Sequence, residues 1–267
     1  MKPYVHGYSP KETRRLADQA NTLTRLLHHD TRYPDGALIL EAGCGIGAQT
    51  VILAANNPGA RFVSIDLSRD SLETARTALE MRGIANVVLQ QADIFSLPFD
   101  PGSFDHIFVC FVLEHLPEPM KALIHLKQVL KKGGTITLIE GDHGSFYCHP
   151  QTREASLAVQ CLVDVQAAMG GNSLIGRQLY PLLCRAGFSS PVVSPRMVYV
   201  DSSRPFLVEG FSKKTFIAMV RGVKDQAMAM GLIDKETWDR GMADLDEATR
   251  EHGTFCYTFF KGVAVNS

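Results

Sequence analysis

The segment at positions 38–47, Leu-Ile-Leu-Glu-Ala-Gly-Cys-Gly-Ile-Gly, most constrains what this chain can fold into. Its apolar run predicts a buried strand, and its three alternating glycines predict a tight turn before a helix that begins at Ala48. Glycine reaches positive φ without a Cβ clash and lets a ligand approach the main chain. Strand, glycine turn and helix in this order are typical of α/β sheets that bind nucleotide-like ligands.

The glycine turn alone leaves three interpretations open. Gly43, Gly45 and Ala48 satisfy the G-x-G-x-x-G/A pattern of NAD-binding folds. The turn could also bind a different nucleoside, or serve the fold only. The residues that follow along the chain have to decide between these readings.

Composition excludes several classes of partner. The formal net charge of -1 provides no attraction to nucleic acid or to an anionic membrane. No apolar run approaches the roughly 20 residues that span a bilayer, and residues 1–6 lack the apolar stretch of a signal peptide. None of the six cysteines has C-x-x-C spacing, so no metal site is predicted. We therefore expect a cytoplasmic protein without nucleic-acid or membrane partners.

Apolar runs that alternate with helical patterns organise the first half of the chain. We predict strands at 37–41, 61–66, 87–90, 106–111 and 135–140, which implies a parallel sheet with right-handed crossovers. After these we predict a helix at 152–169, another through Leu174 to Leu183, and a strand at 192–200 that Pro195 interrupts. Two helices, with an apolar face from Phe216 to Met230 and an N-cap at Asp234, precede a last strand at 253–265.

The predicted carboxyl ends of the strands carry polar side chains. Parallel strands bring these ends to one edge of the sheet, where ligands bind. The residues concerned are Glu41, Asp66, Asp93 with Ile94, Glu114 with His115, and Glu140, Asp142 and His143. A carboxylate only accepts hydrogen bonds, so it suits a ribose diol or an ammonium group and would repel a pyrophosphate. Glu41, two residues before the first glycine, therefore favours a cationic, phosphate-free nucleoside over NAD.

Five motifs in order carry a resemblance to a known family: 41–47, Asp66-Leu67-Ser68, Gln91-Ala92-Asp93-Ile94, Phe104-Asp105-His106-Ile107 and Leu130-Lys131-Lys132-Gly133-Gly134. Over residues 37–141 the chain resembles class I S-adenosylmethionine-dependent methyltransferases. It is similar to the branch that contains ubiquinone and menaquinone biosynthesis methyltransferases. The resemblance implies an α/β, Rossmann-like, doubly wound sheet of seven mostly parallel strands with an antiparallel last strand. Helical insertions would follow strand five and lie between strands six and seven.

The resemblance also implies a cofactor site for S-adenosylmethionine, with S-adenosylhomocysteine as product. Gly43, Gly45 and Gly47 would face the methionine part, Asp66 the ribose, and Asp93 with Ile94 the adenine. Glu41 would lie beside the amino-acid portion. The predicted site is completed by Tyr8, in a segment that resembles those folding over the cofactor, and by Cys44, Leu67 and Glu114.

The resemblance and the predicted strands and helices together suggest a domain organisation. We expect one methyltransferase domain over residues 1–267, with an N-terminal helical cover at 1–36 and a cofactor-binding core at 37–141. Segments 142–172 and 201–252 would be helical insertions over the substrate. Methionine adapts to irregular apolar shapes, so the methionines of these insertions either line a lid over an apolar substrate or fill the core of a small helical subdomain. We expect the methyl acceptor to be a small, partly apolar metabolite. The pattern is compatible with a homodimer.

Catalysis by such an enzyme rests mainly on positioning, because the sulfonium methyl is already activated. A base is needed only where the acceptor loses a proton, and His143 after strand five is the predicted catalytic residue. A hydrogen-bonding loop anchor is the alternative role for His143. Two other functions stay open, an NAD-linked oxidoreductase and a non-catalytic cofactor-binding protein on the same fold. The acceptor atom is not readable from the sequence.

Overall fold

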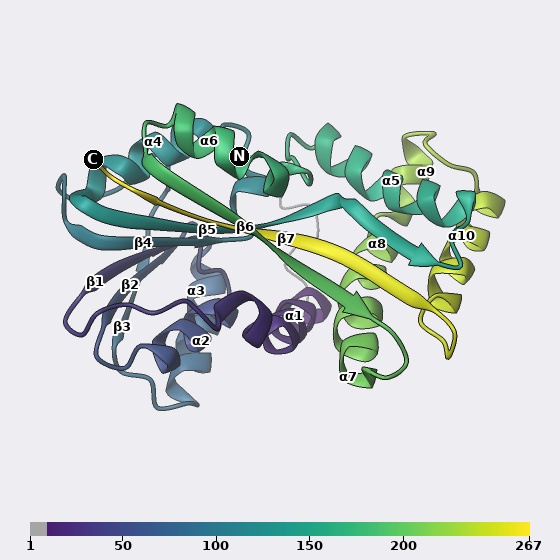
Figure 1. The fold of residues 1–267 in the computed structure, drawn as a ribbon, viewed down its shortest axis with the longest axis horizontal. Coiled ribbons are helices and arrows are strands. Elements are labelled where there is room, and N and C mark those ends of the chain that lie inside the picture. Colours follow the sequence, from purple (N-terminus) through teal and green to yellow (C-terminus); the bar gives the residue numbers. More distant parts are fainter. Residues whose placement is uncertain (1–9) are drawn as a thin grey trace. The chain divides into compact units, whose positions relative to one another are not determined.

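The computed structural model describes residues 10–267, so the prediction for Tyr8 lies outside the described residues. Seven strands form one sheet in the order β3-β2-β1-β4-β5-β7-β6, mostly parallel with an antiparallel last strand (Figure 1). This confirms the predicted fold class. The strands are β1 (Leu38–Ala42), β2 (Arg61–Asp66), β3 (Val87–Gln91), β4 (Phe104–Cys110), β5 (Leu130–His149), β6 (Ser189–Val200) and β7 (Thr254–Val265).

Helices connect the strands and make up the insertions. The α-helices are α1 (Pro10–His28), α2 (Ala48–Asn56), α3 (Arg69–Glu80), α4 (Pro119–Val129), α5 (Arg153–Ala168), α6 (Leu179–Arg185), α7 (Pro205–Leu207), α8 (Ala218–Gly222), α9 (Lys224–Ala229) and α10 (Lys235–Glu247). The 3-10 helices are η1 (Leu113–His115) and η2 (Ile175–Gln178), and η3 (Val208–Ile217) is a π-helix. Within residues 10–267, every helix is too short or too polar to cross a membrane.

The chain divides into two compact units, which we name by their most distinctive residues. The glycine-turn unit consists of Thr24–Glu140, Ile175–Pro195 and Phe260–Ser267. The aromatic unit consists of Gly141–Leu174, Arg196–Phe259 and the chain up to Leu23. Strands β5, β6 and β7 contribute residues to both units. The expected single domain over 1–267 stays a prediction.

The glycine-turn unit has the predicted doubly wound arrangement. β1 lies between β2 and β4, with Leu40 opposite Val63 on one side and Ile107 on the other, in parallel register. Helices α2 and α3 lie on one side of these strands, and α4 and α6 on the other (Figure 1). Strands covered on both faces are apolar throughout, and Ile39, Leu40 and Ile107 are fully buried.

β5 is longer than predicted, and it corrects the expectation of a helical insertion from residue 142. The strand continues to His149, and α5 begins only at Arg153, where the Thr152 side chain accepts from Ala155 N. Glycine, aspartate and serine at 141–145 favour a turn locally. The pairing with β7 overrides this preference, since Ser145 Oγ exchanges hydrogen bonds with Thr258 N and O, 113 residues away.

The predicted apolar face from Phe216 to Met230 is not one continuous helix. It is divided between the π-helix η3, α8 and α9. Phe216, Val220 and Val223 on this face are fully buried, whereas Met230 is exposed. Phe216, Val220 and Val223 therefore lie on one buried face, as the 3.6-residue period predicts, although the segment changes from a π-helix to two short α-helices.

In the aromatic unit, α10 approaches α5 through a residue without a side chain. A Cβ at Gly241 would lie 2.4 Å from the carbonyl oxygen of Glu154. Beside it, Thr152 Oγ1 donates to Asp244 Oδ2 over 2.7 Å, and Trp238 is buried. Glycine is unfavourable inside a helix by about 1 kcal/mol relative to alanine, so its presence here reflects close packing.

We expect Gly241→Ala to lower the free energy of unfolding, because overpacking typically costs about 1–3 kcal/mol and exceeds the gain in helix propensity. Gly222→Ala in α8 is the matched control, since a Cβ there meets nothing within 4 Å. That control should be neutral or slightly stabilising. Urea unfolding of both variants measures the difference, and equal stabilisation of the two would contradict the packing argument.

Candidate functional site

The turn between β1 and α2 requires glycine for two physical reasons. Gly43, Gly45 and Gly47 have φ of 79°, 52° and 78°, in the left-handed region that side chains disfavour. A Cβ at Gly43 would also lie 2.4 Å from Val112 Cγ2, and one at Gly47 would lie 2.9 Å from the Cβ of Ala75. The main chain of this turn is therefore packed tightly from two neighbouring segments.

Asp66, the last residue of β2, links the turn to the neighbouring strand. Its Oδ2 accepts from Gly45 N and its Oδ1 from Ser68 N, both over 2.8 Å. The side chain is half-buried. An ionised carboxylate has about four acceptor positions, so two backbone donors leave it able to accept from the hydroxyls of a ribose. Leu67, directly after it, is exposed, as a residue that covers a bound ring should be.

Glu41 lies near the end of β1 and is almost completely buried. Its Oε2 accepts from Ser64 Oγ over 2.6 Å. Burial raises the pKa of Glu41 from its ordinary value of 4.5 to about 7. A bound ammonium group would offset this desolvation and favour the charged form. Burial likewise raises the pKa of the Cys44 thiol, so Cys44 belongs to the packing of the turn and is not a reactive thiolate.

Asp93 and Ile94 lie in the loop that follows β3. Asp93 Oδ1 accepts from Phe95 N over 2.9 Å, and an isolated antiparallel bridge joins Asp93 to Ser96. Ile94 is half-buried against the hydrophobic core. The loop is therefore held by its own hydrogen bonds, and its acidic and apolar side chains are adjacent in the chain.

Carboxyl groups also gather after β4 and β5. Glu114, predicted for the cofactor, lies in η1 and is buried. Glu140 is fully buried, and its Oε1 accepts from Val112 N over 3.0 Å and from Leu113 N over 2.8 Å. Burial, followed by the charge of Glu114, raises the pKa of Glu140 well above its ordinary value. The sequence marked Glu140 only as a strand-end acid and gave it no role.

His143 lies within β5 and in the aromatic unit, not in a loop after strand five as expected. It is almost completely buried, and its Nδ1 lies 2.8 Å from the hydroxyl of Tyr257. Its backbone N–H donates to Ser173 O over 2.9 Å, and the ring of Phe216 packs edge-on against it. The sequence missed Tyr257, because only the pairing of β5 with β7 brings it to His143.

The other aromatic and methionine residues of the insertions divide into core and surface. Met219 and Met242 are buried, as are Phe211, Phe255 and Phe259. Phe146 stacks on Phe216 with ring centroids 5.1 Å apart. A second set is exposed: Tyr147, Tyr199, Phe206 and Met230. The buried set packs in the core of the aromatic unit, and the exposed set lies on its surface.

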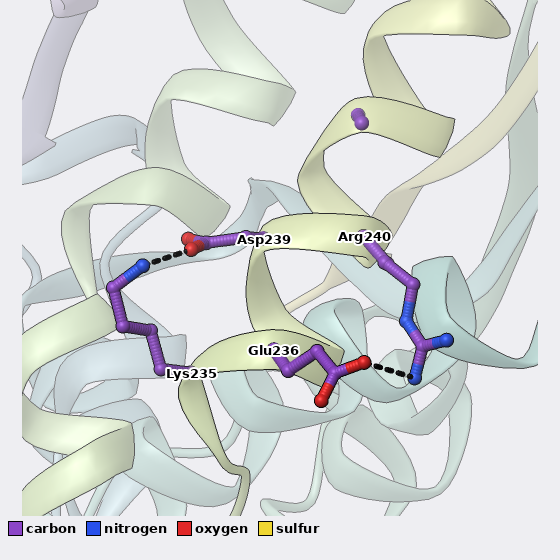
Figure 2. Close-up of a pocket in the computed structure, with 5 residues that line it drawn as sticks. Lys235, Glu236, Asp239 and Arg240 are labelled. Atoms are coloured by element: carbon purple, nitrogen blue, oxygen red, sulfur yellow. Dashed lines mark hydrogen bonds and ion pairs between the residues drawn. The ribbon is translucent and has the colours of Figure 1, made fainter.

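A surface hollow on α10 contains none of the predicted site residues (Figure 2). It is lined by Lys235, Glu236, Asp239, Arg240 and Ala243. Its charges pair with one another, Lys235 with Asp239 over 2.5 Å and Arg240 with Glu236 over 3.7 Å. Among residues 10–267, no group of three or more acidic, histidine or cysteine side chains is arranged to hold a metal ion.

Comparisons with known proteins find similarity to methyltransferases. Residues 40–138 match the family described as a methyltransferase domain. An uncharacterized 37.1 kDa protein in transposon TN4556 of Streptomyces fradiae is 33% identical over 189 residues, which cover 70% of this chain and 54% of that protein. A demethylmenaquinone methyltransferase of Clavibacter sepedonicus is 40% identical over 105 residues, 39% of this chain and 41% of that protein. The chain spans about half the length of the curated relatives it matches.

A solved structure extends the likeness beyond that domain. Phosphoethanolamine N-methyltransferase 2 of Haemonchus contortus, solved in complex with S-adenosyl-L-methionine, superimposes with a TM-score of 0.56 at 17% identity. The match covers 92% of this chain and 52% of that one. At this identity the likeness shows a shared fold.

Glu41 gives a testable dependence of stability on pH. Its pKa is raised in the folded protein, so the folded state holds the proton more tightly than the unfolded chain does. Its contribution is therefore fully present below about pH 4.5 and is lost as the pH rises through about 7. Relative to Glu41→Gln, the wild type should lose about 3 kcal/mol of unfolding free energy across this range. Urea unfolding at several pH values measures this, and parallel curves for the two proteins would contradict it.

Proposed function

We propose that this chain is a methyltransferase of the class I, S-adenosylmethionine-dependent family, because its residues 40–138 match a methyltransferase domain. S-adenosylmethionine is its cofactor and S-adenosylhomocysteine its product. The observation that carries the proposal is the glycine turn tied to Asp66 through Gly45 N. It combines close main-chain access with a carboxylate that has acceptor positions to spare, as a phosphate-free nucleoside requires.

The residues of the glycine-turn unit divide the recognition of the cofactor among them. Gly43 and Gly47 admit the methionine part, Asp66 accepts from the ribose, and Asp93 with Ile94 receives the adenine. Glu41 neutralises the ammonium group. When bound, the cofactor supplies a methyl group activated by its sulfonium centre. The protein then has to orient the acceptor and exclude water, and orientation is worth roughly 7–11 kcal/mol in favourable cases.

The acceptor we propose is a small, partly apolar metabolite. The exposed Tyr147, Tyr199 and Phe206 of the aromatic unit support this, since aromatic side chains provide apolar contact with a polar edge. His143 is the proposed base for an acceptor that must lose a proton. Where Nδ1 carries the ring proton and donates to the Tyr257 hydroxyl, Nε2 is the nitrogen that can take up the proton of the acceptor.

The two other functions are less well supported. An NAD-linked oxidoreductase rests on Gly43, Gly45 and Ala48 alone, and the comparisons do not favour it. The buried carboxyl of Glu41 would also oppose a pyrophosphate at this turn. A non-catalytic protein on the same fold would bind the cofactor without turnover, so formation of S-adenosylhomocysteine with any acceptor separates it from an enzyme.

We expect Asp66→Ala to abolish the thermal shift that S-adenosylhomocysteine produces, because the variant loses both the ribose acceptor and the bond to Gly45 N. Asp70→Ala, at an exposed position in the first turn of α3, is the matched control and should keep the shift. Differential scanning fluorimetry measures both, with NADH as a comparison ligand. An undiminished shift in Asp66→Ala, or a shift with NADH alone, would count against the assigned site.

We expect His143→Gln to slow methyl transfer by about 10²–10⁴-fold, the usual contribution of a general base. Affinity for S-adenosylhomocysteine should stay unchanged, because His143 is not one of the proposed cofactor ligands. Transfer of labelled methyl groups into a metabolite extract measures the rate, with the exposed His149→Gln as the control. Equal rates in the two variants would remove His143 from the proposed mechanism.

A further inference from the structure

The backbone just after β4 adopts a conformation that side chains disfavour. Phe111 has φ of 58°, one of two non-glycine residues with positive φ among residues 10–267. Such residues persist only where their surroundings over-determine the conformation, and they concentrate at functional sites. Phe111 directly precedes the loop that leads into η1, so its conformation sets the course of that loop.

Two adjacent residues of β5 hold this loop. Phe111 N donates to Ile139 O over 2.9 Å, which continues the sheet pairing by one residue. The next two amides, Val112 N and Leu113 N, both donate to Oε1 of Glu140. A side chain thus replaces the backbone acceptor at the point where the loop leaves the sheet. The other oxygen, Oε2, is buried and has no hydrogen-bond partner among residues 10–267.

The held loop in turn closes against the glycine turn. Val112 packs so closely on Gly43 that no Cβ fits between them. A small displacement of Val112 would open this contact and free the backbone at Gly43. Glu114, another residue of the predicted cofactor site, lies two positions further along the same segment.

We infer that Glu140 is a positioning residue, which holds segment 111–113, with its strained Phe111, so that Val112 closes on Gly43 and the cofactor turn keeps its shape. The inference rests on the proposed function in that the turn is taken to bind S-adenosylmethionine. What matters is then the length of the side chain and its acceptor oxygen, and not its charge. Burial raises the pKa of Glu140, as expected for a carboxyl group that supports a loop inside the protein.

A pair of conservative variants separates length from charge. Glu140→Gln keeps the length and the acceptor oxygen, and should bind S-adenosylhomocysteine within about threefold of the wild type. Glu140→Asp keeps the acid but is one methylene shorter, and should bind about tenfold more weakly or worse. Isothermal titration calorimetry measures both. If Glu140→Asp kept the affinity for S-adenosylhomocysteine and Glu140→Gln lost it, the inference would be overturned, because the acid group and not the length of the side chain would then be required.

Hydrogen exchange tests the same inference without any cofactor. In Glu140→Asp the amides of Val112 and Leu113 should exchange faster, whereas Glu140→Gln should leave them protected. Phe62 in β2, whose amide donates to Asn86 O, is an internal reference. Its exchange rate should be the same in both variants and in the wild type. Unaltered exchange at Val112 and Leu113 in Glu140→Asp would overturn the inference. Altered exchange together with a wild type that binds no S-adenosylhomocysteine would instead reject the proposed function and keep the loop assignment.

A substitution at Phe111 tests whether Glu140 is needed because the backbone of Phe111 is strained. Glycine adopts positive φ without penalty, so in a Phe111→Gly background the loss caused by Glu140→Asp should be several-fold smaller than in the wild type. Equal losses in the two backgrounds would contradict the role in holding a strained residue. Glu118→Asp, an exposed position paired with Lys121, controls for the loss of a methylene elsewhere and should bind as the wild type does.

Discussion

The site depends on the hydrogen bond from Gly45 N to the carboxylate of Asp66. This bond joins the turn after β1 to the end of β2, so two parallel strands are connected at their carboxyl edge by a backbone donor and a side-chain acceptor. The same carboxylate accepts from Ser68 N at the start of α3. The acid therefore holds the turn through hydrogen bonds to the main chain on both sides.

Burial governs the acids around this turn in different ways. Asp66 is half-buried and held by two backbone donors, whereas Glu41 and Glu140 are almost completely buried and have raised pKa values. A half-buried carboxylate with two backbone donors keeps acceptor positions for a hydroxyl, whereas a buried carboxyl group is costly to ionise unless a partner offsets the desolvation. Acids that look equivalent at the ends of successive strands thus differ in burial and in hydrogen-bond partners.

The fold by itself leaves the reaction's acceptor open, because one fold supports many chemistries. In the aromatic unit, Phe211, Phe255 and Phe259 are buried in the core, whereas Tyr147 and Phe206 are exposed. The His143–Tyr257 pair provides a candidate base in the same unit.

The sequence by itself determined the elements and the turn. Apolar runs predicted β1 to β5, and the glycine spacing predicted positive φ at Gly43, Gly45 and Gly47, because these features depend on neighbours along the chain. Only the tertiary structure decided that β5 runs to His149, that Tyr257 meets His143, and that Glu140 holds the loop after Phe111. Each of these arises from pairing between segments that are far apart in sequence, and local propensity carries no record of such partners.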